Sequence, residues 1–252
     1  MCFDEAPPPY SIELVEHQRI EPICIFDISG SMDWNLDSKN RRGKRRIDYV
    51  RDLVPDLIRE FGFLDTEIKN ERHKAKKGGI LAYAFNHQVI ELDDINFTTW
   101  ESKKGSLYPS GGTLLCPALE LMMDKYEREF DPKHHRFKST LKKAFHGKLE
   151  PKPKQLVIVL TDGVLGDQEE FKEKIISSEY EGVYFIFALI GVDEDPTFHR
   201  EEYKKLQVFP NIKFIHFKPE TTGEQLVAEL LKIANINGST AKHIKQNNAP
   251  FK

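Results

Sequence analysis

The stretch CIFDISGSMDWN, residues 24–35, joins an apolar run to a turn rich in oxygen-bearing side chains. The run begins at Ile20 and lacks a strict alternation of polar and apolar residues, which predicts a strand buried on both faces of a sheet. It ends at Asp27, and Ser29 and Ser31 follow directly in the turn. This strand therefore delivers one carboxylate and two hydroxyls to a single point in the fold.

Apolar runs and helical patterns alternate along the rest of the chain. Further strands are predicted at 78–86, 88–92, 154–163, 182–192 and 211–217, and helices at 47–62, 113–130, 167–178, 198–207 and from 221 onward. The alternation predicts an α/β fold with a Rossmann-like, doubly wound, mostly parallel sheet. We expect one short antiparallel edge strand, at 88–92, and helices on both faces of the sheet.

Several local signals refine these elements. Pro55 is expected to kink or break the first helix, and Gly62 can end it, so the helix is predicted over 47–62. Thr221 and Glu224 have the spacing of a capping box, so the last helix is predicted to begin near Thr221. Turn-forming residues crowd the segment 98–113, which predicts a loop there.

One domain is expected over residues 18–237, between an N-terminal arm at 1–17 and a C-terminal tail at 238–252. Two basic insertions interrupt it, at about 36–46 and at 131–154. The N-terminus has neither the basic start nor the apolar core of a secretory signal. No apolar stretch approaches the length of a membrane helix, so no membrane partner is expected.

Bulk composition narrows the function classes. The 252 residues carry a net charge of −3, which argues against nucleic-acid binding by overall electrostatics. The three cysteines are widely spaced and form neither a disulfide framework nor a zinc pattern. This suits a reducing compartment, and we expect a cytoplasmic protein, or a nuclear one if the basic run Lys39–Arg46 is a localisation signal.

A second apolar strand also ends in an aspartate, Asp162. Ligands of doubly wound sheets bind outside the carboxyl ends of the strands, so Asp27 and Asp162 are expected at the same edge. Thr113 follows a Gly-Gly pair at the start of a predicted helix and can join them. Five side chains thus form the candidate metal site: Asp27, Ser29, Ser31, Thr113 and Asp162.

These five side chains offer only hard oxygen ligands. Such a set favours Mg²⁺, with Mn²⁺ or Ca²⁺ as alternatives, over zinc or copper. One coordination position would remain open for an Asp or Glu carboxylate of a protein partner. Completing the metal's coordination with an outside carboxylate is a specific way to recognise a protein partner.

Three short motifs resemble the von Willebrand factor A (vWA) domain with a complete metal-ion-dependent adhesion site. They are DISGSM at 27–32, GGT at 111–113 and TDG at 161–163, and the resemblance covers roughly residues 18–236. It implies that Ser29, Ser31 and Thr113 coordinate the metal directly, whereas Asp27 and Asp162 act mostly through water. It also implies the strand order 3-2-1-4-5-6 and a protein-binding role, so we expect a binding module that is not an enzyme. The two basic insertions depart from the family pattern.

Two other functional classes stay open at this point. A phosphoryl-transfer enzyme of the haloacid dehalogenase type would use Asp27 as nucleophile, but it needs a second carboxylate where this chain has Ser29. The basic loops could instead bind nucleic acid or another acidic surface. For the protein-binding role, Trp34, Tyr108 and Gly112 are the candidate partner-binding rim, although Trp34 could alternatively pack under its own loop.

Overall fold

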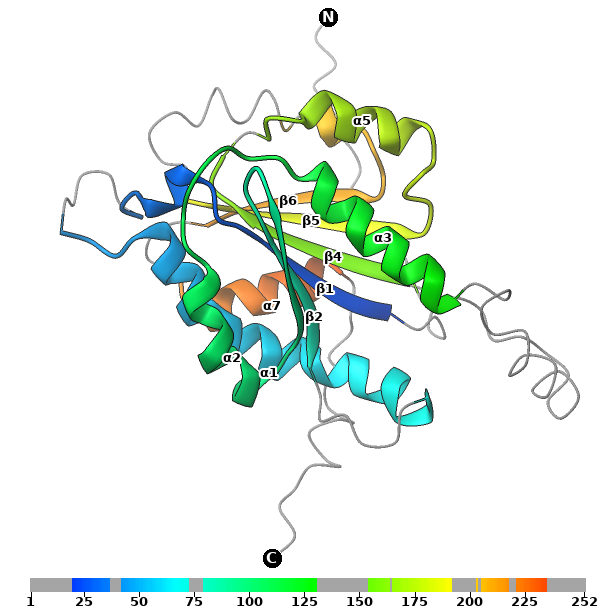
Figure 1. Ribbon diagram of the computed structural model, residues 1–252, viewed down its shortest axis with the longest axis horizontal. Coiled ribbons are helices and arrows are strands. Elements are labelled where there is room, and N and C mark those ends of the chain that lie inside the picture. Colours follow the sequence, from blue (N-terminus) through cyan, green and yellow to red (C-terminus); the bar gives the residue numbers. More distant parts are fainter. Residues whose placement is uncertain are drawn as a thin grey trace, which may run out of the picture.

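A single mixed sheet organises the molecule (Figure 1). The computed structural model describes residues 20–36, 42–72, 79–130, 154–163, 165–191, 203, 205–217 and 221–234. Among them, six strands lie in the order β3-β2-β1-β4-β5-β6. They are β1 (Ile20–Asp27), β2 (Ile80–Phe85), β3 (Val89–Ile95), β4 (Lys154–Thr161), β5 (Val183–Ile190) and β6 (Ile212–Phe217). All neighbours are parallel except β2 and β3, so the predicted order and antiparallel edge strand are confirmed.

Helices cover both faces of this sheet (Figure 1). One face carries α1 (Arg46–Arg72), α2 (Phe97–Lys103) and α7 (Gly223–Ile233), and the other carries α3 (Cys116–Phe130) and α5 (Gln168–Ile176). The side chains of β1 explain the two layers, because Cys24 and Phe26 pack with the first group of helices, whereas Ile23 and Ile25 pack with the second. The predicted doubly wound architecture is therefore confirmed.

Helix α1 is longer than the sequence signals indicate. The prediction that Gly62 ends it is wrong, since α1 continues to Arg72. Pro55 does not break it either and lies inside the continuous helix. A glycine in a helix interior disfavours the helix by only about 1 kcal/mol and a proline by about 3 kcal/mol. Burial of Leu57 and Phe61 against the sheet offsets such penalties.

The segment 98–113 was predicted to be a loop, and this is wrong for its first half. Helix α2 forms there and is followed by the short 3-10 helix η2 (Lys104–Ser106). Asn96 begins α2 with a capping box to Thr99, and Trp100 anchors it in the core beside Phe26. Only one large apolar side chain of α2 is buried, so the sequence shows no helical period there.

Two helix starts differ from their predicted positions. The capping box of α7 is formed by Thr222 and Gln225, one residue after the predicted pair Thr221 and Glu224. Helix α3 begins at Cys116 instead of Thr113, which leaves Thr113 in the preceding loop.

Some predictions lie outside the described residues. These are the arm at 1–17, the tail at 238–252, most of the insertion at 131–154 and most of the helix predicted at 198–207. The domain boundaries therefore stay predictions. None of the helices in the described part of the chain is long and apolar enough to cross a membrane.

Candidate metal centre

The carboxylates of Asp27 and Asp162 lie at the carboxyl ends of the neighbouring strands β1 and β4. Asp27 is the last residue of β1, and Asp162 directly follows β4. Parallel pairing aligns the two strand ends, with Phe26 opposite Leu160. Both carboxylates are buried. Thr161 Oγ1 donates a hydrogen bond of 2.6 Å to Asp27 Oδ2 and so joins the two strand ends directly.

The turn after β1 brings both serines to the same point. Ser29 N donates to Asp27 Oδ1 at 2.7 Å, and Ser29 precedes the 3-10 helix η1 (Gly30–Asp33). The hydroxyl oxygens of Ser29 and Ser31 are 3.1 Å apart. Ser31 Oγ donates to Asp162 Oδ1 at 2.9 Å. Four of the five predicted residues are thus joined in one hydrogen-bonded chain, in which the backbone N–H of Ser29 makes the link to Asp27.

Thr113 is brought to this edge by its backbone. Gly30 N donates to Gly111 O at 3.0 Å, which fastens the loop before α3 to the serine turn. Gly111 has φ +70°, and an added Cβ would lie 2.1 Å from His87 Nδ1, so this position requires glycine. Thr113 O accepts a hydrogen bond of 2.7 Å from Gly166 N, just beyond Asp162. The half-buried Thr113 is therefore held between the serine turn after β1 and the loop after β4.

The two buried carboxylates are incompletely neutralised. Burial, together with the negative charge of Asp162, raises the pKa of Asp27 to about 6, although hydrogen bonds from Thr161 and Ser29 oppose the shift. Arg46 Nη1 pairs with Asp162 Oδ2 at 2.7 Å. Of the two, only the Asp162 carboxylate is thus paired with a cation among the described residues, and both carboxylates lie in a set of oxygen donors, an arrangement that fits a hard divalent cation.

Thr161 and Arg46 belong to this site and were not singled out by sequence reasoning. Thr161 carries a usable signal, because it is a hydroxyl at the last position of β4, directly before Asp162 and at the edge of the sheet where Asp27 ends β1. Arg46 carries none, since it reads as one cation in a basic run and its partner lies 116 residues away. The contact between Arg46 and Asp162 exists only in the folded chain.

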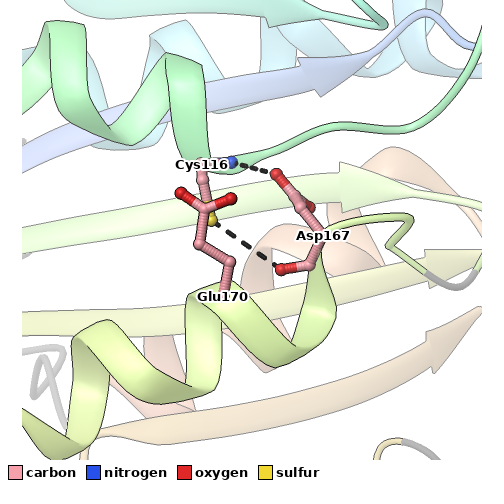
Figure 2. Close-up of side chains that lie close together, drawn as sticks. All are labelled: Cys116, Asp167 and Glu170. Atoms are coloured by element: carbon pink, nitrogen blue, oxygen red, sulfur yellow. Dashed lines mark hydrogen bonds between the residues drawn. The ribbon is translucent and has the colours of Figure 1, made fainter.

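A second polar cluster joins the start of α3 to the start of α5 (Figure 2). Asp167 Oδ2 accepts a hydrogen bond of 2.6 Å from Cys116 N, while Cys116 Sγ lies 3.9 Å from Asp167 O. The Cys116 thiol, the Asp167 carboxylate and the Glu170 carboxylate lie within 4.8 Å of one another. Burial and these carboxylates raise the pKa of the thiol, so it stays neutral. The cluster acts as a cross-helix cap that fixes the end of the Thr113 loop.

The predicted partner-binding rim is exposed to solvent. The exposed fraction is 63% for Trp34 and 74% for Tyr108, and Gly112 is exposed as well. Trp34 is therefore not packed under its own loop. One face of its ring nevertheless meets the Arg46 guanidinium, whose carbon lies 5.5 Å from the ring centroid.

The described part of the basic run 39–46 is largely neutralised within the chain. Lys44 pairs with Asp52 at 2.6 Å. Arg45 pairs with Asp33 at 2.8 Å and with Asp48 at 2.7 Å. These contacts weaken the hypothesis that this loop presents a positive surface to nucleic acid.

No family model matches the chain, and no curated protein is similar to it in sequence. Solved structures resemble it in fold. The D319A mutant of the PilB minor pilin from Streptococcus sanguinis has a TM-score of 0.55 at 14% identity, over 94% of this chain and 65% of the pilin. The PilB minor pilin itself gives 0.52 at 15% identity, over 94% and 64%. Manganese-loaded TRAP from Plasmodium vivax gives 0.48 at 17% identity, over 86% and 74%.

This chain thus spans slightly less than two thirds of the PilB pilin. At such identities, the likeness concerns the fold alone. Combined with the observed strand order, it establishes that the chain has a vWA-like α/β fold of Rossmann type.

Proposed function

We propose that this chain is a divalent-metal-dependent module that captures an acidic side chain of a partner protein. The observation that carries the proposal is the hydrogen-bonded chain from Asp27 through Ser29 and Ser31 to Asp162, which lies at the carboxyl ends of β1 and β4 and of which only Ser31 is not fully buried. Burying two neighbouring carboxylates of which only Asp162 has a bonded cation in the described part of the chain costs stability, so a purely structural cluster gains nothing from this arrangement.

Two kinds of side chain would hold the cation in different ways. On the vWA resemblance, the hydroxyls of Ser29, Ser31 and Thr113 would bind it directly, and the carboxylates of Asp27 and Asp162 would do so through water. The all-oxygen donor set favours Mg²⁺, with Mn²⁺ and Ca²⁺ as alternatives. When bound, the ion offers a positive position that can accept an outside carboxylate.

The partner would approach over the exposed rim. Trp34 and Tyr108 supply aromatic surface of the kind that concentrates binding energy at protein interfaces. The exposed Gly112 lies next to Thr113 and leaves the approach free of a side chain. An Asp or Glu of the partner would complete the site, which makes recognition depend on metal.

A pull-down with the immobilised chain tests this function. Partner capture should occur in Mg²⁺ and be lost in EDTA, and both Asp27→Ala and Thr113→Ala should abolish it. The matched controls are Asp124→Ala and Thr98→Ala, which remove the same groups from exposed positions away from the site. Capture that survives chelation and both site variants would refute the proposal.

The phosphoryl-transfer alternative has a separate test. The Ser29 hydroxyl, which stands where a general acid would be needed, is hydrogen-bonded to Ser31 and cannot supply a proton readily at neutral pH. We expect no turnover of p-nitrophenyl phosphate in Mg²⁺. Turnover that disappears in Asp27→Asn would favour the enzyme instead.

A further inference from the structure

Arg46 occupies a buried slot beside the candidate metal centre. It is the first residue of α1, and only 10% of its side chain is exposed. Nη1 donates to Asp162 Oδ2 at 2.7 Å, and Nη2 donates to Gly191 O at 3.0 Å. One guanidinium therefore binds a carboxylate of the site and the backbone just after β5.

The slot is shaped for this side chain. Gly191 forms its floor with φ +68°, and an added Cβ would lie 2.8 Å from Arg46 Nε. The Trp34 ring covers the guanidinium from the side of the serine turn. Guanidinium keeps its proton throughout the physiological range, so the slot holds a permanent positive charge against the site.

This charge changes the balance at the centre. Asp27 and Asp162, when ionised, carry two negative charges, and Arg46 carries one positive charge. Addition of a divalent cation would leave the group with a net charge of +1, which a single carboxylate neutralises. Without Arg46, the loaded group would already be neutral, and an incoming carboxylate would make it negative.

We propose, in an inference that rests on the proposed function, that Arg46 is a built-in counter-cation. It lowers the affinity of the site for the metal and raises the affinity of the metal-loaded site for a carboxylate. It competes with the divalent ion for Asp162 and therefore weakens metal binding. Once metal is bound, the same charge strengthens capture of an anionic ligand. Arg46 thus tunes the site to require a carboxylate partner for full occupancy.

The test measures both affinities in the full chain with Mn²⁺ and acetate as probes. Mn²⁺ binding is followed by electron paramagnetic resonance, and acetate binding by the loss of water-proton relaxation enhancement in the Mn²⁺-loaded protein. In Arg46→Gln, Mn²⁺ affinity should rise about tenfold or more, whereas acetate affinity should fall by about tenfold. Arg46→Lys keeps the charge but loses the forked hydrogen bonds and the stacking on Trp34, so both of its affinities should lie between those of the wild type and those of Arg46→Gln.

Arg45→Gln is the matched control, because Arg45 pairs with Asp33 and Asp48 at the surface and contacts neither site carboxylate. Both of its affinities should remain those of the wild type. If Arg46→Gln unfolds in EDTA, the stability of the variant replaces the binding measurement. Mn²⁺ should then refold the variant and raise its Tm by more than it raises the Tm of the wild type, because tighter binding of Mn²⁺ stabilises the folded state more. Unchanged Mn²⁺ affinity in Arg46→Gln would overturn the role of Arg46 alone. No Mn²⁺ binding by the wild type would overturn the proposed function and this inference together.

Discussion

Asp162 and Asp167 are five residues apart, yet their carboxylates have opposite uses. One carboxylate oxygen of Asp167 accepts a hydrogen bond from the backbone N–H of Cys116 and thereby caps α3 (Figure 2). Asp162 is more deeply buried and receives hydrogen bonds from Ser31 and Arg46, while the buried Asp27 carboxylate raises the charge density beside it. The cap joins two helices, whereas the strand-end site gathers charge. The difference teaches that burial of like charges, more than the number of acidic residues, marks the Asp27 and Asp162 group as the candidate ligand site.

The largest effect is expected from Asp162→Ala. This change leaves the buried Arg46 guanidinium without its carboxylate, so the free energy of unfolding should fall by about 3–5 kcal/mol in urea denaturation. The neighbouring Arg45 is 42% exposed, and Arg45→Gln should lower the unfolding free energy by less than about 1 kcal/mol. Equal losses of unfolding free energy in Asp162→Ala and Arg45→Gln would show that the buried ion pair stabilises the fold no more than an exposed one.

Asp27→Asn should have the opposite effect and raise the free energy of unfolding. Folding raises the pKa of Asp27 from 3.8 to about 6, so the folded state holds its proton more tightly than the unfolded state does. Without metal, the unfolding free energy contributed by this group therefore falls as pH rises from about 4 to about 6. At pH 7, Asp27→Asn should raise the free energy of unfolding in EDTA by up to about 3 kcal/mol.

The comparison of urea unfolding at pH 4 and pH 7 isolates this effect. The stabilisation by Asp27→Asn should be large at pH 7 and small at pH 4, and Mg²⁺ should stabilise the wild type but not the variant. A variant less stable than the metal-free wild type at pH 7 would mean that the Asp27 carboxylate is not strained by its burial.

The smallest effect is expected at the helix cap. Asp167→Ala removes the acceptor for Cys116 N and should lower the unfolding free energy by about 1 kcal/mol, with the stabilisation by Mg²⁺ retained. Asp167→Asn keeps an acceptor oxygen and should recover most of the loss. If Asp167→Ala removed the Mg²⁺ effect altogether, the distinction between the two clusters would be broken.

The sheet was predictable because its signals are local. Strand β1 was predicted with its observed bounds, Ile20–Asp27, since a short apolar run without strict alternation is typical of a strand buried on both faces. The five candidate metal ligands followed from strand ends and short motifs, and four of them are joined by hydrogen bonds as described above.

The remaining features depend on tertiary contacts. Helix α1 passes Gly62 because packing outweighs a weak stop signal, and α2 depends on the single buried anchor Trp100. Arg46 joins the site only when Asp162 and Gly191 come together in the fold. No pattern within a short stretch of sequence encodes such a meeting.

Isothermal titration of Mg²⁺ into the metal-free wild type and into Asp27→Ala tests the central claim most directly. The wild type should bind one ion, and Asp27→Ala should show no heat above dilution. Asp124→Ala, which removes an exposed carboxylate of α3, should bind as the wild type does. Absence of binding in the wild type, or equal binding in Asp27→Ala, would contradict a metal centre at the carboxyl ends of β1 and β4.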